Sequence, residues 1–163
     1  MNPPHSFSHL NEKGEVHMVD VTDKVVTGRQ ATAESWVRMS QETFEALQAE
    51  RAPKGDVLAT VRLAAIMAVK KTSELIPLCH PLSVEKVACQ IELHSPDRVR
   101  IEVTATICGK TGVEMEALTG ASVGALTLYD MLKALDKGMT IGPTRLMRKT
   151  GGRSGDFQRE AES

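Results

Sequence analysis

The sequence predicts an α+β fold, a ferredoxin-like βαββαβ sandwich with an antiparallel sheet and its helices on one face. Four segments alternate apolar and polar residues, as half-buried strands do: 29–39, 83–93, 99–109 and 139–149. Two longer segments with helical periodicity lie between them, at 54–78 and 112–137. The resulting order of strand, helix, strand, strand, helix, strand is the split βαβ pattern of this fold.

The composition limits the class of protein. Hydrophobic residues make up 41% of the 163 residues and charged residues 25%, as in ordinary globular domains, but only 3% are aromatic. A core of small aliphatic side chains buries little area per residue, which favours an oligomer. The formal net charge of −1 does not indicate a nucleic-acid partner, and no apolar run reaches the roughly 18 residues of a membrane span.

Cysteine usage and the termini predict localisation and domain organisation. The cysteines Cys79, Cys89 and Cys108 include no CxxC pair, which argues against a disulfide framework or a zinc knuckle. The polar N-terminus lacks the apolar segment of a signal peptide, so we expect a cytoplasmic protein. We expect a flexible lead at 1–17, a single domain at 18–149 and a Gly-rich mobile tail at 150–163.

Capping residues predict where the first two helices begin. Ser40 can cap a short helix that ends near Ala49, and Asp56 is a suitable N-cap for the first long helix. Pro77 ends that helix because proline lacks the N–H that the helix needs. Its core-facing side is expected to comprise Val57, Val61, Ala64, Ala68 (or Met67) and Leu75.

The second long helix carries a stripe of small residues. They recur at i, i+3, i+4, i+7 and i+8, and are Ala117, Gly120, Ala121, Gly124 and Ala125. Such a stripe allows another element to approach the helix backbone closely. The strands before this helix are joined by the turn "SPDR", and the last strand follows Gly138.

The stretch "IPLCHPL" (76–82) is the first candidate site. It lacks further Cys or His at ligand spacing, so we expect no metal. Neighbouring residues of an extended turn point in opposite directions, which argues against a Cys79–His80 catalytic couple. Two interpretations remain from the residues alone: a rigid connector, or a turn whose prolines present a side chain and free carbonyls to a ligand.

Two further stretches have both a structural and a functional interpretation. Asp130 and Lys133, at i and i+3 of a helix, form by default a surface ion pair. In "GKTGVEMEALTG" (109–120) the acids suit a helix N-terminus, and free N–H groups there could bind an anion. No GxxxxGK[ST] occurs, which excludes a P-loop.

Seven segments together resemble the MoaC family, the cyclic pyranopterin monophosphate synthases of molybdenum-cofactor biosynthesis. They cover most of the chain and are "MVDVTDK" (18–24), "TGRQA" (27–31), "KGDVLAT" (54–60), "KKTSELIPLCHPL" (70–82), "KTGVEMEALT" (110–119), "ALTLYDMLKA" (125–134) and "KTGGRSG" (149–155). One departure is Arg153, which stands where the family has a lysine and keeps the charge with a different geometry.

The resemblance implies a lyase without a cofactor. Its substrate would be 3′,8-cyclo-7,8-dihydro-GTP, supplied by a radical-SAM partner enzyme, and its products cyclic pyranopterin monophosphate and pyrophosphate. The catalytic residues would be Asp130 and Lys133. The implied substrate-binding residues are Leu78, Cys79, His80, Met115, Glu116, Lys54, Arg29, Glu114 and Lys149.

Helix geometry gives one sharper expectation. Glu116 and Asp130 are 14 residues apart in one predicted helix, which separates them by about 21 Å along its axis. They cannot line one small pocket of the same chain, so a shared site would have to lie between subunits. This agrees with the oligomers of the family, hexamers built as trimers of dimers. A different class, a non-catalytic nucleotide-binding regulator, stays open because a fold does not determine function.

Overall fold

The computed structural model describes residues 15–152 and 155–160. Its sheet has the strand order β2-β3-β1-β4-β5, and every neighbouring pair is antiparallel. The strands are β1 (Thr27–Arg38), β2 (Lys86–His94), β3 (Arg98–Gly109), β4 (Thr140–Thr150) and β5 (Phe157–Gln158). The helices are α1 (Gln41–Gln48), α2 (Val57–Lys70), α3 (Thr72–Leu75) and α4 (Glu114–Leu132).

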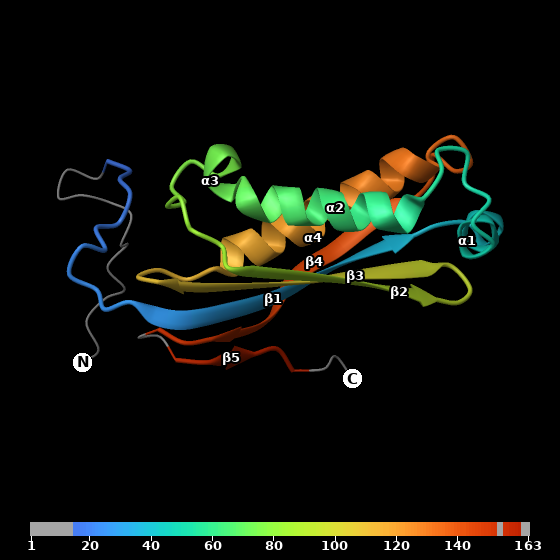
Figure 1. Cartoon of the computed structure of the whole chain (residues 1–163). Helices are drawn as coiled ribbons and strands as arrows, with labels where there is room; N and C mark the ends of the chain where they lie inside the picture. Colours follow the sequence, from blue (N-terminus) through green and yellow to red (C-terminus); the bar gives the residue numbers. More distant parts are fainter. Residues whose placement is uncertain (1–14, 153–154, 161–163) are drawn as a thin grey trace.

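The predicted ferredoxin-like arrangement is confirmed. The first four strands follow the βαββαβ order, and α2 and α4 lie side by side on one face of the sheet (Figure 1). The structure adds β5, in which Phe157 pairs with Lys149 and Gln158 with Arg148. The sequence did not predict this strand, because two residues are too few for an alternating pattern.

Small residues allow α4 to pack closely on α2 and on β3. All five members of the predicted stripe are buried. A Cβ atom on Gly120 would lie 2.7 Å from Cγ2 of Val69 on α2 and 2.9 Å from Cγ1 of Val103 on β3. No larger residue fits there without displacing side chains of both elements. The core is therefore built by close approach of backbones rather than by large aromatic side chains.

The predicted core face of the first long helix is partly wrong. Its buried residues are Val57, Val61, Ala65, Ala68 and Val69. Leu75 is 56% exposed and Met67 51% exposed. The helix breaks at Lys71, and the Thr72 hydroxyl donates to the carbonyls of Ala68 and Val69. A separate short helix then turns the chain, so the periodicity of α2 does not extend to Leu75.

The other predicted boundaries differ by a few residues. Ser40 caps α1 and Asp56 caps α2, through bonds from the N–H groups of Thr43 and Ala59, as predicted. The second long helix is shorter than 112–137, and β2 begins at residue 86 rather than 83. No helix within the described residues is long and apolar enough to span a membrane.

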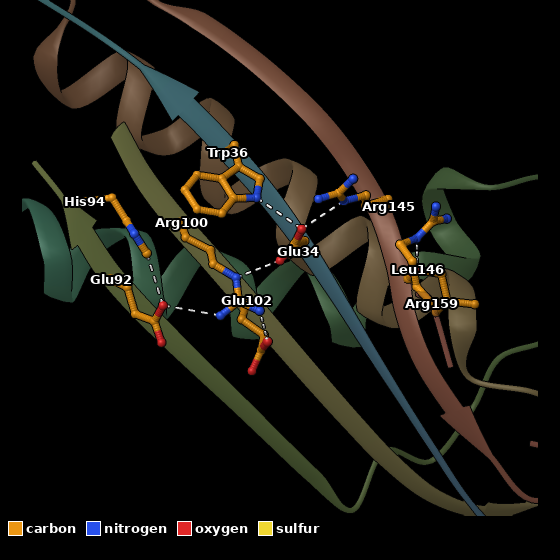
Figure 2. A network of polar contacts seen from close by, with 9 residues as sticks. All are labelled: Glu34, Trp36, Glu92, His94, Arg100, Glu102, Arg145, Leu146 and Arg159. Atoms are coloured by element: carbon orange, nitrogen blue, oxygen red, sulfur yellow. Dashed lines mark hydrogen bonds and ion pairs between the residues drawn. The ribbon is translucent and has the colours of Figure 1, made fainter. Parts of the chain in front are cut away.

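The opposite face of the sheet carries a polar network centred on Glu34, which is 2% exposed (Figure 2). Its carboxylate accepts from Nε of Arg100 at 2.6 Å, Nε of Arg145 at 2.9 Å and the indole N–H of Trp36 at 3.1 Å. Burial alone would raise the pKa of Glu34, but these three donors outweigh burial and lower it. Glu34 is therefore an ionised carboxylate shared by two arginines from neighbouring strands.

Candidate active site

A cavity of about 460 Å³ lies where α4 begins. The chain reaches it from three directions: the connection between α3 and β2, the first turn of α4, and the segment that precedes β1. Six residues predicted to bind substrate line it together: Leu78, Cys79, His80, Glu114, Met115 and Glu116. Residues more than 30 positions apart in the sequence are thus gathered at one end of the molecule.

The prolines of "IPLCHPL" flank a turn that faces this cavity. The Cys79 N–H donates to the carbonyl of Ile76 at 3.1 Å, which closes the turn. Nε2 of His80 lies 2.9 Å from the carbonyl oxygen of Val19. A carbonyl only accepts, so Nε2 carries a proton and donates this bond. The imidazole is held in one orientation by the segment that precedes β1.

Among the titratable groups that line this cavity, the Glu116 carboxyl is the most buried. It is 3% exposed, and burial raises its pKa, with a smaller contribution from the nearby charge of Glu114. Burial also raises the pKa of the Cys79 thiol, and Glu116 adds to that effect. A thiol so placed stays protonated at neutral pH, which argues against a cysteine nucleophile.

Replacing Glu116 by glutamine is expected to stabilise the protein near neutral pH. Because the folded state holds the Glu116 proton more tightly than the unfolded state, stability falls as pH rises from the ordinary carboxyl pKa to the raised one. The amide has no charge to bury, so Glu116→Gln should unfold at a higher temperature than wild type at about pH 7 and at nearly the same temperature at about pH 4. Thermal unfolding at both pH values measures this, and a lower temperature at neutral pH would contradict it.

Two more predicted residues, Arg29 and Lys149, meet Glu114 beside the cavity. Arg29, Glu114 and Lys149 surround a small hollow that shares Gly112 and Glu114 with the larger cavity. The Lys149 ammonium lies 3.8 Å from the Glu114 carboxylate, and Nε of Arg29 donates to the carbonyl of Gly109 at 3.0 Å. This group therefore extends the cavity with two cations.

The glycine pair after β4 allows the chain to pass close to Gly28 and Arg29. A Cβ on Gly151 would lie 2.4 Å from the carbonyl oxygen of Gly28, and one on Gly152 would lie 2.3 Å from a guanidinium nitrogen of Arg29. Both glycines also have positive φ, 86° and 85°. Arg153, the departure noted in the sequence, lies outside the described residues.

The remaining predicted residues form a second group at the C-terminal end of α4. Nζ of Lys133 lies 2.7 Å from one oxygen of Asp130, and Nζ of Lys54 lies 2.7 Å from the other. Lys54 also donates to the Asp130 backbone carbonyl at 2.8 Å. Hydrogen bonds from Lys133 and Lys54 lower the pKa of Asp130 to about 2, and Asp130 in turn raises the pKa of Lys133. The group is a carboxylate between two ammonium ions, with a net positive charge.

One chain does not bring the two groups together. Glu116 and Asp130 both belong to α4, 14 residues apart, which is about 21 Å along the helix axis. In Figure 1, α4 begins near α3 and the N-terminal segment and ends at the opposite end of the molecule, toward α1. The expectation that both lie on one helix is confirmed, and each end of the helix holds part of the predicted site.

The residues chosen from the sequence omitted part of the cavity wall. Val19, Val21 and Lys24 line it from the segment before β1, and Thr111 and Gly112 line it before α4. The Lys110 ammonium holds that segment through the carbonyl of Thr22, at 2.6 Å. Lys24 adds a cation that periodicity could not reveal, although it lies within the "MVDVTDK" segment of the family resemblance. Within the described residues, no group of three His, Cys, Asp or Glu side chains could hold a metal ion.

Comparison with known families identifies the family of the chain. The model of the MoaC family matches residues 18–152, a span that includes both groups and most of the sheet. The chain belongs to the MoaC family. This membership implies a role in molybdenum-cofactor biosynthesis, as an enzyme acting on a pterin-related small molecule. Both ends of α4 in this MoaC-family protein lie within the matched region, so neither is an addition to the common domain.

Proposed function

We propose that this protein is a cyclic pyranopterin monophosphate synthase. It is a lyase that converts 3′,8-cyclo-7,8-dihydro-GTP into cyclic pyranopterin monophosphate and pyrophosphate. The observation that carries the proposal, together with family membership, is the placement of two complementary groups at opposite ends of α4. The reaction takes place where the cavity of one subunit meets the Lys54–Asp130–Lys133 group of another.

The Lys54–Asp130–Lys133 group suits the phosphate chemistry. Cleaving the α–β phosphoanhydride and closing a cyclic phosphate places negative charge on phosphoryl oxygens, which ammonium groups stabilise. Two lysines lie within 2.7 Å of one carboxylate, so the carboxylate positions both cations. With its pKa at about 2, Asp130 is ionised at neutral pH and can accept a proton in the reaction but not donate one.

The cavity at the other end of α4 suits the ring chemistry. Opening a purine-derived ring and building a pterin requires proton transfers by groups that titrate near neutral pH. Burial shifts the Glu116 pKa upward, toward this range, and the His80 imidazole lines the same cavity. Arg29, Lys149 and Lys24 supply further cations around the same cavity.

The outer surface of the helical layer supports an interface between subunits. Leu63 and Met67 on α2 are 60% and 51% exposed, and Leu126 on α4 is 58% exposed. Leu126 lies between the two halves of the site, on the helix that carries both. Helices with apolar residues on the solvent side are typical of packed assemblies. We propose a homo-oligomer, a hexamer built as a trimer of dimers, in the cytoplasm.

A charge on this surface is expected to separate the subunits. Leu126→Glu would bury a carboxylate without a partner at the interface, and should weaken association about tenfold or more and reduce turnover with it. Gln48→Glu, which adds the same charge to α1, is the matched control and should change neither. Sedimentation and turnover are measured on the same samples. A monomeric Leu126→Glu protein with full turnover would contradict a site between subunits.

A direct assay tests the proposed reaction. The purified protein is incubated with 3′,8-cyclo-7,8-dihydro-GTP made by the radical-SAM partner enzyme, and pyrophosphate and the cyclic phosphate product are measured together. We expect equal amounts of both from the wild type and neither from Asp130→Asn. Absence of pyrophosphate when the substrate is demonstrably present would refute the proposal, and binding of the substrate without turnover would support a regulator instead.

A further inference from the structure

A second hollow lies on the polar face of the sheet, away from the helices. It has a volume of about 340 Å³, within the range of small-molecule pockets. Trp36 and three arginines, Arg38, Arg98 and Arg145, line it, and it shares no lining residue with the cavity at the start of α4. Nothing in the proposed reaction uses this hollow.

A β-bulge in β4 accounts for the space. Ser35 pairs with Thr144 and Val37 with Ile141, so Gly142 and Pro143 together stand opposite the single residue Trp36. A Cβ built on Gly142 would meet no atom within 4 Å. Trp36, Gly142 and Pro143 all line the hollow.

The charges around the hollow are unbalanced. Arg38 and Arg98 share one carboxylate, that of Asp97, at 2.9 Å and 3.6 Å, and their side chains are 68% and 59% exposed. Arg145 pairs with Glu34, which Arg100 also uses (Figure 2). Arg38 and Arg98 thus share a single carboxylate, so this edge of the hollow keeps excess positive charge. Two exposed guanidinium groups can bind a phosphate through paired N–H donors.

The indole is held in a fixed position beside these cations. Its N–H donates to Glu34 at 3.1 Å, and its ring packs against His94 with centroids 4.9 Å apart. Because the ring also lines the hollow, a planar ligand can stack on it while its anionic group meets the arginines. A nucleoside monophosphate has both parts in one molecule of this size.

We propose that this hollow binds a nucleoside monophosphate, with the base on Trp36 and the phosphate between Arg38 and Arg98. The site is separate from the proposed active site and needs no second subunit. Its occupation can be followed directly, because Trp36 is the only tryptophan of the chain. Stacking of a base on this ring quenches its fluorescence.

The test titrates the full-length protein with GMP and follows Trp36 emission, with guanosine and inorganic phosphate as separate ligands. We expect saturable quenching by GMP, at least about tenfold weaker binding of guanosine, and no quenching by phosphate. The double variant Arg38→Gln/Arg98→Gln should weaken GMP binding about tenfold or more. Arg51→Gln, at an exposed arginine outside the hollow, should leave binding unchanged. If the double variant does not fold, each single variant gives the same comparison.

Four outcomes would overturn the proposal. They are no saturable quenching, equal binding of guanosine and GMP, a double variant that binds like wild type, and loss of quenching in Lys54→Ala, which would place the ligand in the proposed active site. Sedimentation of the double variant tests for a fifth outcome that would overturn the proposal. A change in its oligomeric state would show that the hollow is a contact between copies of the chain rather than a ligand site.

Discussion

An Asp130→Ala protein mixed with a His80→Ala protein is expected to regain about a quarter of the wild-type turnover after subunit exchange. Each variant alone should lose about 10²- to 10⁴-fold in rate, the usual contribution of an acid–base or positioning group. The two residues belong to opposite ends of the molecule, and α4 connects the two groups that contain them. In a hybrid dimer, one of the two sites combines the intact cavity of the Asp130→Ala subunit with the intact lysine group of the His80→Ala subunit.

The chain offers a matched control for this experiment. Lys54 and Asp130 lie in the same group, 2.7 Å apart, so a mixture of Lys54→Ala and Asp130→Ala should regain nothing. In every hybrid of that pair the lysine group is damaged in both subunits. Turnover is measured by pyrophosphate release before and after exchange. A mixture of Asp130 and His80 variants that stays inactive despite proven exchange would refute the shared site.

Glu34→Ala is expected to destabilise the protein by about 3 kcal/mol, although Glu34 takes no part in the proposed reaction. The substitution takes the common carboxylate from Arg100 and Arg145, both about four-fifths buried, and Arg100 keeps only Glu92 and Glu102, which are more exposed than Glu34. It also removes the acceptor of the Trp36 N–H. Breaking a buried ion pair from one side costs more than the pair contributes, because the remaining charge stays desolvated. Urea unfolding, followed by Trp36 fluorescence and circular dichroism, measures the change.

Glu92→Ala is the control on the same network. Glu92 also contacts Arg100, at 3.3 Å, but its side chain is 47% exposed, so its removal should cost less than about 1 kcal/mol. Glu34→Gln keeps the shape and one acceptor, and should fall between the two. Equal effects of Glu34→Ala and Glu92→Ala would mean that burial does not control the strength of this network.

Several features of the fold could be predicted from local sequence. Alternating residues indicated the four principal strands, Ser40 and Asp56 indicated two helix starts, and the small-residue stripe indicated a close contact of α4. Each depends on a repeat or a cap that a few neighbouring residues specify. The core face of α2 was predicted less well, because packing against α4 and the break at Lys71 select which of several adjacent aliphatic residues are buried.

Some residues of the candidate site could likewise be recognised from local sequence, and others could not. Asp130 with Lys133 could be recognised from spacing on one helix turn. Lys54 was named as a substrate-binding residue from the family resemblance, but its contact with Asp130, across 76 positions, is shown only by the structure. Lys24 was missed because nothing in its neighbourhood shows that the segment before β1 folds over the cavity, where the carbonyl of Val19 meets His80.

By itself, the sequence determined the order of elements, the family, and the separation of Glu116 from Asp130 along one helix. These follow from periodicity, from motifs and from the fixed rise of an α-helix. The tertiary structure decided which charges meet: two lysines on Asp130, two arginines on Glu34, and an upward-shifted pKa at Glu116. Such pairings and burial depend on distances between segments far apart in the chain, which residue spacing does not encode.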